Sequence, residues 1–169
     1  KLIQCDIMYE HRPSKFKCNT YTPLSTIALK YIEKTLNVSI VAELNKTDAV
    51  SGSEKYVVEK DLKINTKIAI NPEEQIATIA PSDLQIQEVK LKTEGRVDYS
   101  QTSAVDIRFS NANTTAQSLF SILPDHFSSS LDNIDLTGHV VIDGFLKGKT
   151  YGTNDPALGC NYTFKKAKL

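Results

Sequence analysis

The chain has 169 residues, of which 40% are hydrophobic and 24% are charged, and its 20 basic residues balance 20 acidic ones. This composition fits one folded domain with a core and excludes wholesale disorder. Because phosphate recognition needs clustered Lys and Arg, a neutral chain without a basic cluster argues against nucleic acid as a partner.

Alternating apolar and polar residues predict a strand at residues 1–10, and the HRPS stretch at 11–14 predicts a hairpin turn. The clearest alternation is LKINTKIAI at 62–70, whereas NKTDAVSGS at 45–53 has the composition of a loop. A strand over 136–146 contains glycines, which permit a bend or a close approach. Further strands are expected at residues 16–20, 27–31, 36–44, 76–80, 84–93, 96–99 and 105–109, and after the Asn-Asp-Pro break at 154–156.

One segment, TTAQSLFSILPDHF at 114–127, has helical spacing. Thr114 and Gln117 resemble a capping box, and Leu119, Phe120 and Leu123 form an apolar stripe. Pro124 ends or kinks this helix. We expect the stripe to pack on the sheet.

About ten strands with short turns indicate a mainly β fold with one short α-helix. Polar strand faces rich in Lys, Asn, Thr, Glu and Ser predict an antiparallel sheet with one side facing water. A sheet of this size must curl, split or close, so we expect a long curled sheet that forms a groove or a half-barrel. Residues 1–169 form a single β-rich domain in this interpretation. No apolar run reaches the roughly 18 residues of a membrane span. The sequence starts at Lys1 without Met and contains no signal peptide, which suggests that it is a segment of a longer chain.

No catalytic, cofactor or metal site is predicted. The segment at 144–150 has three residues between its glycines where a phosphate loop needs four, and no helix can follow it. His11, His126 and His139 lie far apart in sequence, without a metal-ligand spacing. The acidic pair at 73–74 falls in a predicted turn, where carboxylates are solvated. We therefore expect a binding protein and not an enzyme.

The three cysteines are Cys5, Cys18 and Cys160. With a turn at 11–14, Cys5 and Cys18 would be diagonal neighbours on adjacent strands, about 7–8 Å apart, which is long for a disulfide. Three buried free thiols are therefore expected, because free cysteine packs as a small hydrophobe.

From about Tyr56 to the C-terminus, roughly two-thirds of the chain, the order of segments resembles the AsmA-like family of bacterial envelope proteins, especially Bacteroidetes members. The segments that carry this resemblance are structural and contain no catalytic residue. They are the Lys-Tyr lead-in at 54–58 with LKINTKIAINPEEQIATI, then LQIQEVKLKTEGRVDY, AVDIRFSNANTTAQSLFSILP and LTGHVVIDGFLKGKTYGTNDPALGCNYTFKKAKL.

The resemblance implies a periplasmic segment of an inner-membrane-anchored protein, with the anchor outside residues 1–169. It also implies a function in outer-membrane biogenesis, in which an apolar β-groove binds or conducts phospholipid acyl chains between the membranes. The expected partners are phospholipid or fatty-acid acyl chains and adjacent segments of the same full-length chain. Unpaired sheet edges make an edge-to-edge dimer of the isolated segment a further expectation.

A one-sided apolar sheet without an active site also suits an acyl-chain groove on physical grounds, since each buried methylene contributes roughly 0.8 kcal/mol. The alternative is that the same residues form an ordinary core packed against the helix, and alternation alone does not separate the two. The residues expected to line such a groove are Leu36, Val38, Ile40, Leu62, Ile64, Ile68, Ile70, Val105, Ile107, Val140 and Ile142.

A second hypothesis is a structural or interaction β domain of the cell envelope that binds a protein or glycan partner. Glycan sites usually carry exposed aromatic residues, and this chain has no Trp. Tyr9 and Tyr31 share the parity of apolar residues on their strands, which makes this hypothesis the weaker one.

Overall fold

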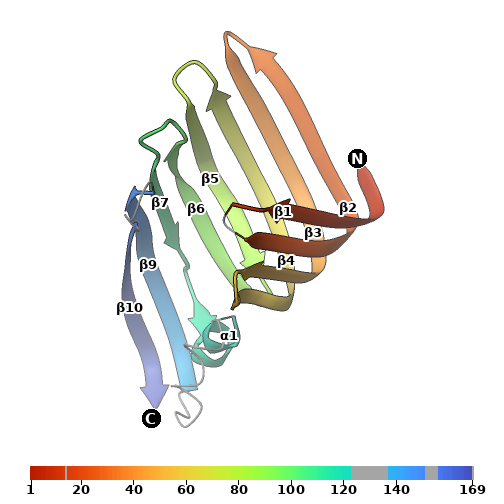
Figure 1. The fold of residues 1–169 in the computed structure, drawn as a ribbon. Helices are drawn as coiled ribbons and strands as arrows, with labels where there is room; N and C mark the ends of the chain where they lie inside the picture. Colours follow the sequence, from red (N-terminus) through yellow and green to blue (C-terminus); the bar gives the residue numbers. More distant parts are fainter. Residues whose placement is uncertain (14, 123–136, 151–155, 169) are drawn as a thin grey trace.

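The computed structural model describes residues 1–13, 15–122, 137–150 and 156–168. These residues form one open, antiparallel sheet of ten strands and one short helix (Figure 1). The predicted mainly β class is therefore confirmed. The strands are β1 (Leu2–His11), β2 (Phe16–Ile32), β3 (Thr35–Ser51), β4 (Glu54–Asn71), β5 (Ile76–Ile86), β6 (Val89–Asp98), β7 (Ala104–Ser110), β8 (Thr114–Thr115), β9 (Thr137–Lys149) and β10 (Ala157–Lys168), and the helix is α1 (Ala116–Ser121).

The strands lie in the sheet in nearly the order of the chain. Each strand from β1 to β7 pairs with the next, β7 then pairs with β9, and β9 pairs with β10. The two-residue strand β8 pairs with the far end of β9, beside α1. Such neighbouring connections need only short turns, in agreement with the turn signals in the sequence.

Several sequence predictions about strand limits are wrong. The separate strands predicted at 16–20 and 27–31 are one continuous strand, β2. The predicted loop at 45–53 is mostly strand, because β3 continues to Ser51 and the chain turns at Gly52. The predicted strand at 84–93 is interrupted by a turn, in which Gln87 has a φ of 52°. Left-handed turn positions are usually occupied by Gly, Asn or Asp, and Gln87 is none of these.

The strands β2, β3 and β4 are long and bend sharply part-way along. Figure 1 shows their β1-proximal halves turning across the front of the remaining strands. We call this part the N-terminal arm; it consists of β1 with residues 16–22, 47–51 and 54–60. Shifts in strand register mark the bend, between Tyr21 and Leu24 in β2 and between Leu44 and Thr47 in β3. Such bulges increase the local twist and redirect a strand.

Two aspartates hold the bulged backbone at the bend. Lys46 and Glu59 have left-handed backbone conformations, with φ of 49° and 48°. The Lys46 N–H donates to Asp61 Oδ1 at 3.1 Å, and the Glu59 N–H donates to Asp48 Oδ1 at 2.9 Å. Each carboxylate therefore satisfies an amide that the irregular backbone presents at the bulge.

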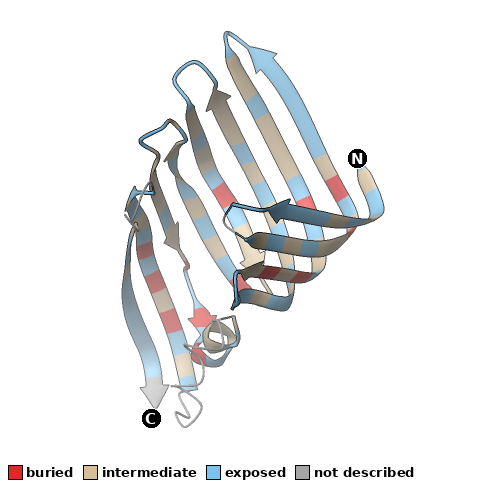
Figure 2. Cartoon of the chain, in the orientation of Figure 1, coloured by how far each residue is buried: buried red, intermediate tan, exposed pale blue. Residues whose placement is uncertain are grey.

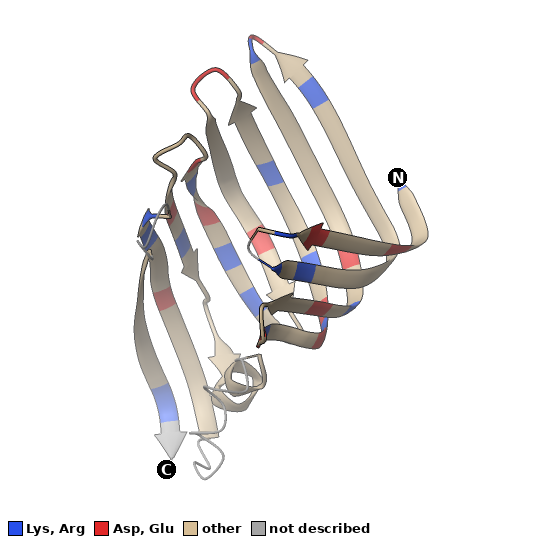
Figure 3. Cartoon of the chain, in the orientation of Figure 1, with Lys and Arg blue, Asp and Glu red and all other residues tan. Residues whose placement is uncertain are grey.

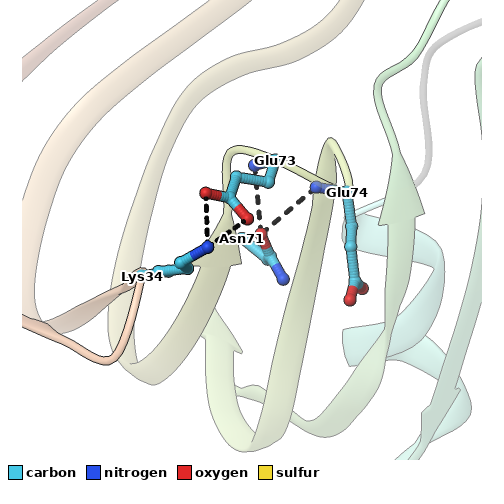
Figure 4. Close-up of polar contacts among 4 residues, drawn as sticks. All are labelled: Lys34, Asn71, Glu73 and Glu74. Carbon is cyan, nitrogen blue, oxygen red and sulfur yellow. Dashed lines mark hydrogen bonds and ion pairs between the residues drawn. The ribbon is translucent and has the colours of Figure 1, made fainter.

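At the ends of β2, β3 and β4 that lie away from the N-terminal arm, polar contacts join the turns to one another (Figure 4). Asn71 Oδ1 accepts hydrogen bonds from the N–H groups of Glu73 and Glu74, at 3.0 and 3.2 Å. Lys34, in the β2–β3 turn, forms an ion pair with Glu73 at 3.0 Å. The Tyr99 hydroxyl donates to the carbonyl of Asn71 at 3.2 Å. The predicted turn at Asn71-Pro72 is therefore present and is linked to its neighbours.

The helix is shorter than predicted. It covers Ala116–Ser121, and its N-cap is Thr115, whose Oγ1 accepts from the Ser118 N–H at 3.0 Å. The expected capping box at Thr114 and Gln117 is therefore wrong by one residue, because Thr114 pairs in β8 instead. The predicted residues 123–127, including Pro124, lie outside the described part of the chain.

Few apolar side chains are fully buried. Among the described residues, the buried hydrophobic ones are Ala42, Ala49, Val89, Ala116, Val140 and Ile142. Figure 2 shows buried bands on β9 beside α1 and at the bend of the long strands. The chain exposes 11716 Å², whereas a compact monomer of 18.8 kDa exposes roughly 8,300 Å². The sheet is therefore largely a single layer.

Candidate functional site

Strand register places apolar residues of nearly every strand on the same side of the sheet. Directly paired residues of antiparallel strands project to the same face. Leu36 pairs with Tyr31 and Ile70, and Ile64 pairs with Leu84. The same alignment continues through Leu91, Val97, Val105, Ile107, Leu146 and Leu158. We call this side the apolar face.

All eleven residues predicted to line a groove lie on the apolar face. The pairs Leu36–Ile70, Val38–Ile68 and Leu44–Leu62 connect β3 with β4. Val105 and Ile107 pair with β9 at Gly148 and Leu146. Val140 and Ile142, further along β9, pair with Phe164 and Tyr162 of β10. The alternation in the sequence predicted the side within each strand, and the register joins the strands into one surface.

Sequence reasoning missed other members of the apolar face. Ile79, Leu84 and Ile86 of β5 pair across to Gly95, Leu91 and Val89 of β6. The sequence pattern predicts one strand that contains both Leu84 and Leu91, whereas the structure makes them cross-strand partners. The turn that separates the two strands lies at Gln87, which has a positive φ, and no residue pattern in the sequence indicates it.

The apolar face differs sharply in burial along its length. Nine of the eleven predicted residues, all except Val140 and Ile142, are half-buried. Val140 is 0% exposed and Ile142 is 6% exposed. These two residues form a small core with Ala116, and Phe109, Leu119 and Phe120 pack against it. We call this cluster the covered end, and the stretch from β3 to β7 the open stretch.

Polar and glycine contacts fix the covered end. The Asn111 N–H donates to the Ile142 carbonyl at 3.0 Å, and the Ile142 N–H donates to Asn111 Oδ1 at 2.7 Å. A Cβ at Gly144 would overlap the ring of Phe109, which confirms the predicted close approach at a β9 glycine. The Ser118 hydroxyl also donates to the Glu88 carboxylate at 3.1 Å, which joins α1 to the β5–β6 turn.

Hydrogen-bonded pairs of hydroxyl groups interrupt the apolar surface between β4 and β5 and near the bend. Thr66 and Ser82 are hydrogen-bonded at 2.7 Å between β4 and β5. Near the bend, Thr22 and Ser25 are hydrogen-bonded at 2.6 Å, and Thr22 also donates to the Glu43 carbonyl. Because these hydroxyls already have partners, they add little desolvation cost to an apolar surface.

The opposite, polar face carries cross-strand ion pairs, and Figure 3 shows charges of both signs spread over the strands. Lys63 pairs with Glu43 at 3.1 Å, Lys92 pairs with Asp83, and Lys147 pairs with Asp106 at 2.8 Å. The hydrogen bond from Lys147 is the main reason that the pKa of Asp106 lies below its usual value. These exposed pairs contribute little stability each, but they make this side a hydrated surface.

A hollow of about 380 Å³ lies over β3 to β6 and is lined by residues of both faces. They include Glu43, Lys63, Asp83 and Lys90 of the polar face, and Ala42, Ile64, Leu84 and Leu91 of the apolar face. Its two carboxylates are engaged in the ion pairs described above. These two carboxylates are therefore not free to act as a general acid or base.

The cysteines do not form an activated nucleophile. Cys5 pairs with Thr22 and Cys18 pairs with Tyr9, so the two are four residues apart along the hairpin, and all three cysteines are free. Burial raises the pKa of Cys18 and of Cys160, and Asp48 and Asp143 add to the respective effects. A raised pKa disfavours the reactive thiolate. The expectation of three buried thiols is wrong, because Cys160 is exposed on the edge strand.

Two further features of the described part of the chain concern metal sites and membrane-spanning helices. No group of three or more His, Cys, Asp or Glu side chains lies close enough there to hold a metal ion. His126 falls outside the described residues. None of the helices in that part is long and apolar enough to span a membrane.

Comparisons of the chain with protein-family models, with curated proteins and with solved structures find no match.

Proposed function

We propose that this chain is an AsmA-like segment of a bacterial envelope protein that holds phospholipid or fatty-acid acyl chains on its apolar face. The observation that supports this most is the open stretch. Nine predicted lining residues lie on one face and remain half-buried, in a chain that exposes far more surface than a compact monomer of its mass. A large contiguous apolar surface is a typical mark of a binding site.

The energy available from such a face is sufficient for a lipid tail. A buried methylene contributes roughly 0.8 kcal/mol, so about ten methylenes that are half-buried against the sheet would contribute about 4 kcal/mol. No charged anchor is needed for that contribution. On the open stretch, the hydroxyls of Thr66 and Ser82 are hydrogen-bonded to each other, so this polar interruption is satisfied.

The bend of the long strands supports a groove in preference to a flat surface. The N-terminal arm turns across the sheet (Figure 1), and α1 stands at the covered end. We propose that these two features border a half-barrel whose interior is the apolar face, with the ion-paired face outside. Adjacent segments of the full-length chain would extend the sheet at β1 and β10, which are its outer strands.

The cellular role follows from the resemblance and from this groove. We propose a periplasmic location, with the anchor in the inner membrane supplied by another part of the protein. Phospholipid would pass along the apolar face toward the outer membrane, and no enzymatic step is required. The ion pairs on the other face suit contact with water along the whole path.

The proposal is tested by lipid analysis and by a matched pair of variants. Native mass spectrometry with organic extraction should reveal bound phospholipid or fatty acid in the purified chain. Binding of a fluorescent fatty acid should fall at least tenfold for Ile64→Asp, because the charge lies in the open stretch. Val41 is exposed on the polar face of the neighbouring strand β3. The control variant Val41→Asp should therefore bind the fluorescent fatty acid as the parent does. Equal binding by both variants, or a lipid-free parent that ignores the probe, would overturn the proposal.

A second candidate is an interaction domain that binds a glycan or protein of the envelope, and the aromatic pair on β10 favours it. Tyr162 and Phe164 are exposed, with ring centroids 5.5 Å apart. Exposed aromatic rings of this kind stack on sugar faces. If this candidate is right, Tyr162→Ala should abolish binding to one class of glycan on an array while Ile64→Asp leaves it unchanged.

A further inference from the structure

A hydrogen-bonded pair of hydroxyl groups, Thr66 and Ser82, lies within the open stretch. Thr66 pairs with Ile40 of β3, and Ile64 and Ile68 are its neighbours on the same face of β4. Thr66 is half-buried, whereas Ser82 of β5 is 4% exposed. Thr66 is therefore a polar group that a molecule on the apolar face can reach, and isoleucines flank it.

The hydrogen bonds of this pair use both hydroxyl protons. A hydroxyl has one proton to donate and two lone pairs that accept. The Ser82 hydroxyl donates to the carbonyl of Ala80, so it has no proton left for Thr66. Thr66 must then be the donor in the bond of 2.7 Å between Thr66 Oγ1 and Ser82 Oγ. Thr66 Oγ1 is left with lone pairs and no free proton, which makes it an acceptor only.

Two other hydroxyl pairs, Thr22–Ser25 and Thr20–Thr47, are arranged in the same way but are closed to a ligand. In each pair the first residue donates to a backbone carbonyl, so the second residue is the donor within the pair. Ser25 is 3% exposed and Thr47 is 4% exposed. Among these three pairs, Thr66 is therefore the one terminal hydroxyl that lies open on the surface.

An acceptor without a proton selects the group that can lie on it. An unsubstituted acyl chain removes Thr66 Oγ1 from water and gives it no hydrogen bond in return. A hydroxyl on the chain replaces that hydrogen bond. A carboxylate or an ester carbonyl has no proton to donate, and an amide brings a carbonyl for which the hydroxyl pair has no donor. An ammonium group would lose its hydration among the isoleucines.

We propose that Thr66 accepts a hydrogen bond from a hydroxyl carried on the acyl chain, so that the open stretch binds hydroxylated acyl chains in preference to unsubstituted ones. This inference rests on the proposed function, because it names the class of acyl chain that the same surface takes. Since Thr66 lies among isoleucines, the hydroxyl belongs to the hydrocarbon part of the ligand and not to its charged end.

The first test compares three ligands that differ at one carbon atom. Stearic acid, its mid-chain hydroxyl derivative and the methyl ether of that derivative compete with a fluorescent fatty acid for the purified chain. The hydroxyl derivative should bind about three- to tenfold more tightly than stearic acid, which is what one hydrogen bond of this kind contributes. The methyl ether keeps the oxygen but has no proton to donate, so it should bind no more tightly than stearic acid.

The outcomes of this competition separate the inference from the proposed function. Stearic acid that binds as tightly as its hydroxyl derivative would overturn the inference and leave acyl-chain binding intact. A methyl ether that binds as tightly as the hydroxyl derivative would also overturn it, because the proton would then be irrelevant. If none of the three ligands binds, the proposed function and the inference both fail.

The second test uses matched threonine variants. Thr66→Val keeps the branched shape and removes the acceptor, and it leaves no donor unpaired, because the Ser82 proton stays on the Ala80 carbonyl. It should abolish the preference for the hydroxyl derivative while stearic acid still binds. Thr66→Ser restores the hydroxyl and should restore the preference. Thr47→Val makes the same change at a buried hydroxyl pair and should keep the preference. A preference that survives Thr66→Val, or that Thr47→Val removes equally, would refute the role of Thr66, with circular dichroism confirming that each variant is folded.

Discussion

The covered end and the open stretch of the apolar face carry the same kind of sequence but have different surroundings. Ile142 in β9 and Ile64 in β4 both alternate with polar neighbours and both lie on the same face. Ile142 is buried because Ala116 and the partly buried Phe109, Leu119 and Phe120 gather around Val140 and Ile142. Ile64 has strands on both sides but no second layer of that kind among the described residues, and it stays half-buried. Alternation thus determines which face a residue occupies, and a second layer determines whether it is buried.

This difference bears on the two hypotheses that the sequence leaves open, a groove or an ordinary core. An ordinary core requires a second layer over the whole face, and among the described residues such a layer is seen at the covered end. The open stretch has the partial exposure that a bound hydrocarbon chain would remove. A single substitution in each region can therefore show whether the distinction holds in solution.

The largest effect is expected from an aspartate in each region. Ile142→Asp should destabilise the fold by about 4 kcal/mol or more, because an unpaired carboxylate would be buried. Ile64→Asp should cost less than about 1 kcal/mol, because its carboxylate can reach water. Urea denaturation followed by circular dichroism measures both. Equal losses at the two positions would mean that the open stretch is covered in solution, and the contrast would fail.

A smaller effect tests the polar support of the covered end. Asn111 is buried, and its side chain accepts the Ile142 N–H. Asn111→Ala should lower the free energy of unfolding by roughly 1–3 kcal/mol, because that amide would lose its partner in a buried place. The matched control is Asn113→Ala, the same chemical change at an exposed position two residues away, which should be nearly neutral. Similar melting temperatures for the two variants would contradict the assigned role of Asn111.

The sequence was sufficient to predict the strand-rich class, the short helix and the common side of the eleven apolar residues. Those features follow from the period of alternation and from local turn composition, both of which are local properties. The turn at Gln87 and the continuation of β3 to Ser51 were not predictable in that way. Gln87, Lys46 and Glu59 adopt left-handed backbone conformations although none is glycine. Their N–H groups donate to Asp61 or Asp48, which are distant in sequence. The contrast between Ile64 and Ile142 was equally invisible, because it depends on where α1 packs.

A still smaller loss of unfolding free energy is expected at the bend that borders the open stretch. Asp48→Ala should cost roughly 0.5–1.5 kcal/mol, since the Glu59 N–H at the bulge would lose its hydrogen bond. Asp48→Asn keeps an acceptor oxygen and should retain most of that stability. Hydrogen exchange at the Glu59 amide, measured by NMR, should quicken in the alanine variant and not in the asparagine variant. Unchanged exchange in both would show that the bulge is held by the strand pairing alone.

The smallest effect concerns the polar face behind the open stretch. The pKa of Asp106 is lowered chiefly by the hydrogen bond from Lys147. A carboxyl with a lowered pKa in the folded state stabilises the fold at pH values above its pKa in the unfolded chain, about 3.9. That contribution disappears as the pH falls through the lower folded-state pKa.

Between pH 5 and the acid range, the unfolding free energy of the parent should therefore decline slightly more than that of Asp106→Asn. Lys147→Met should reduce the decline in the same way, because it removes the donor and leaves the carboxyl exposed. A parent and two variants with the same acid dependence would show that this ion pair is too well hydrated to stabilise the sheet, and that the polar face serves only to keep that side in water.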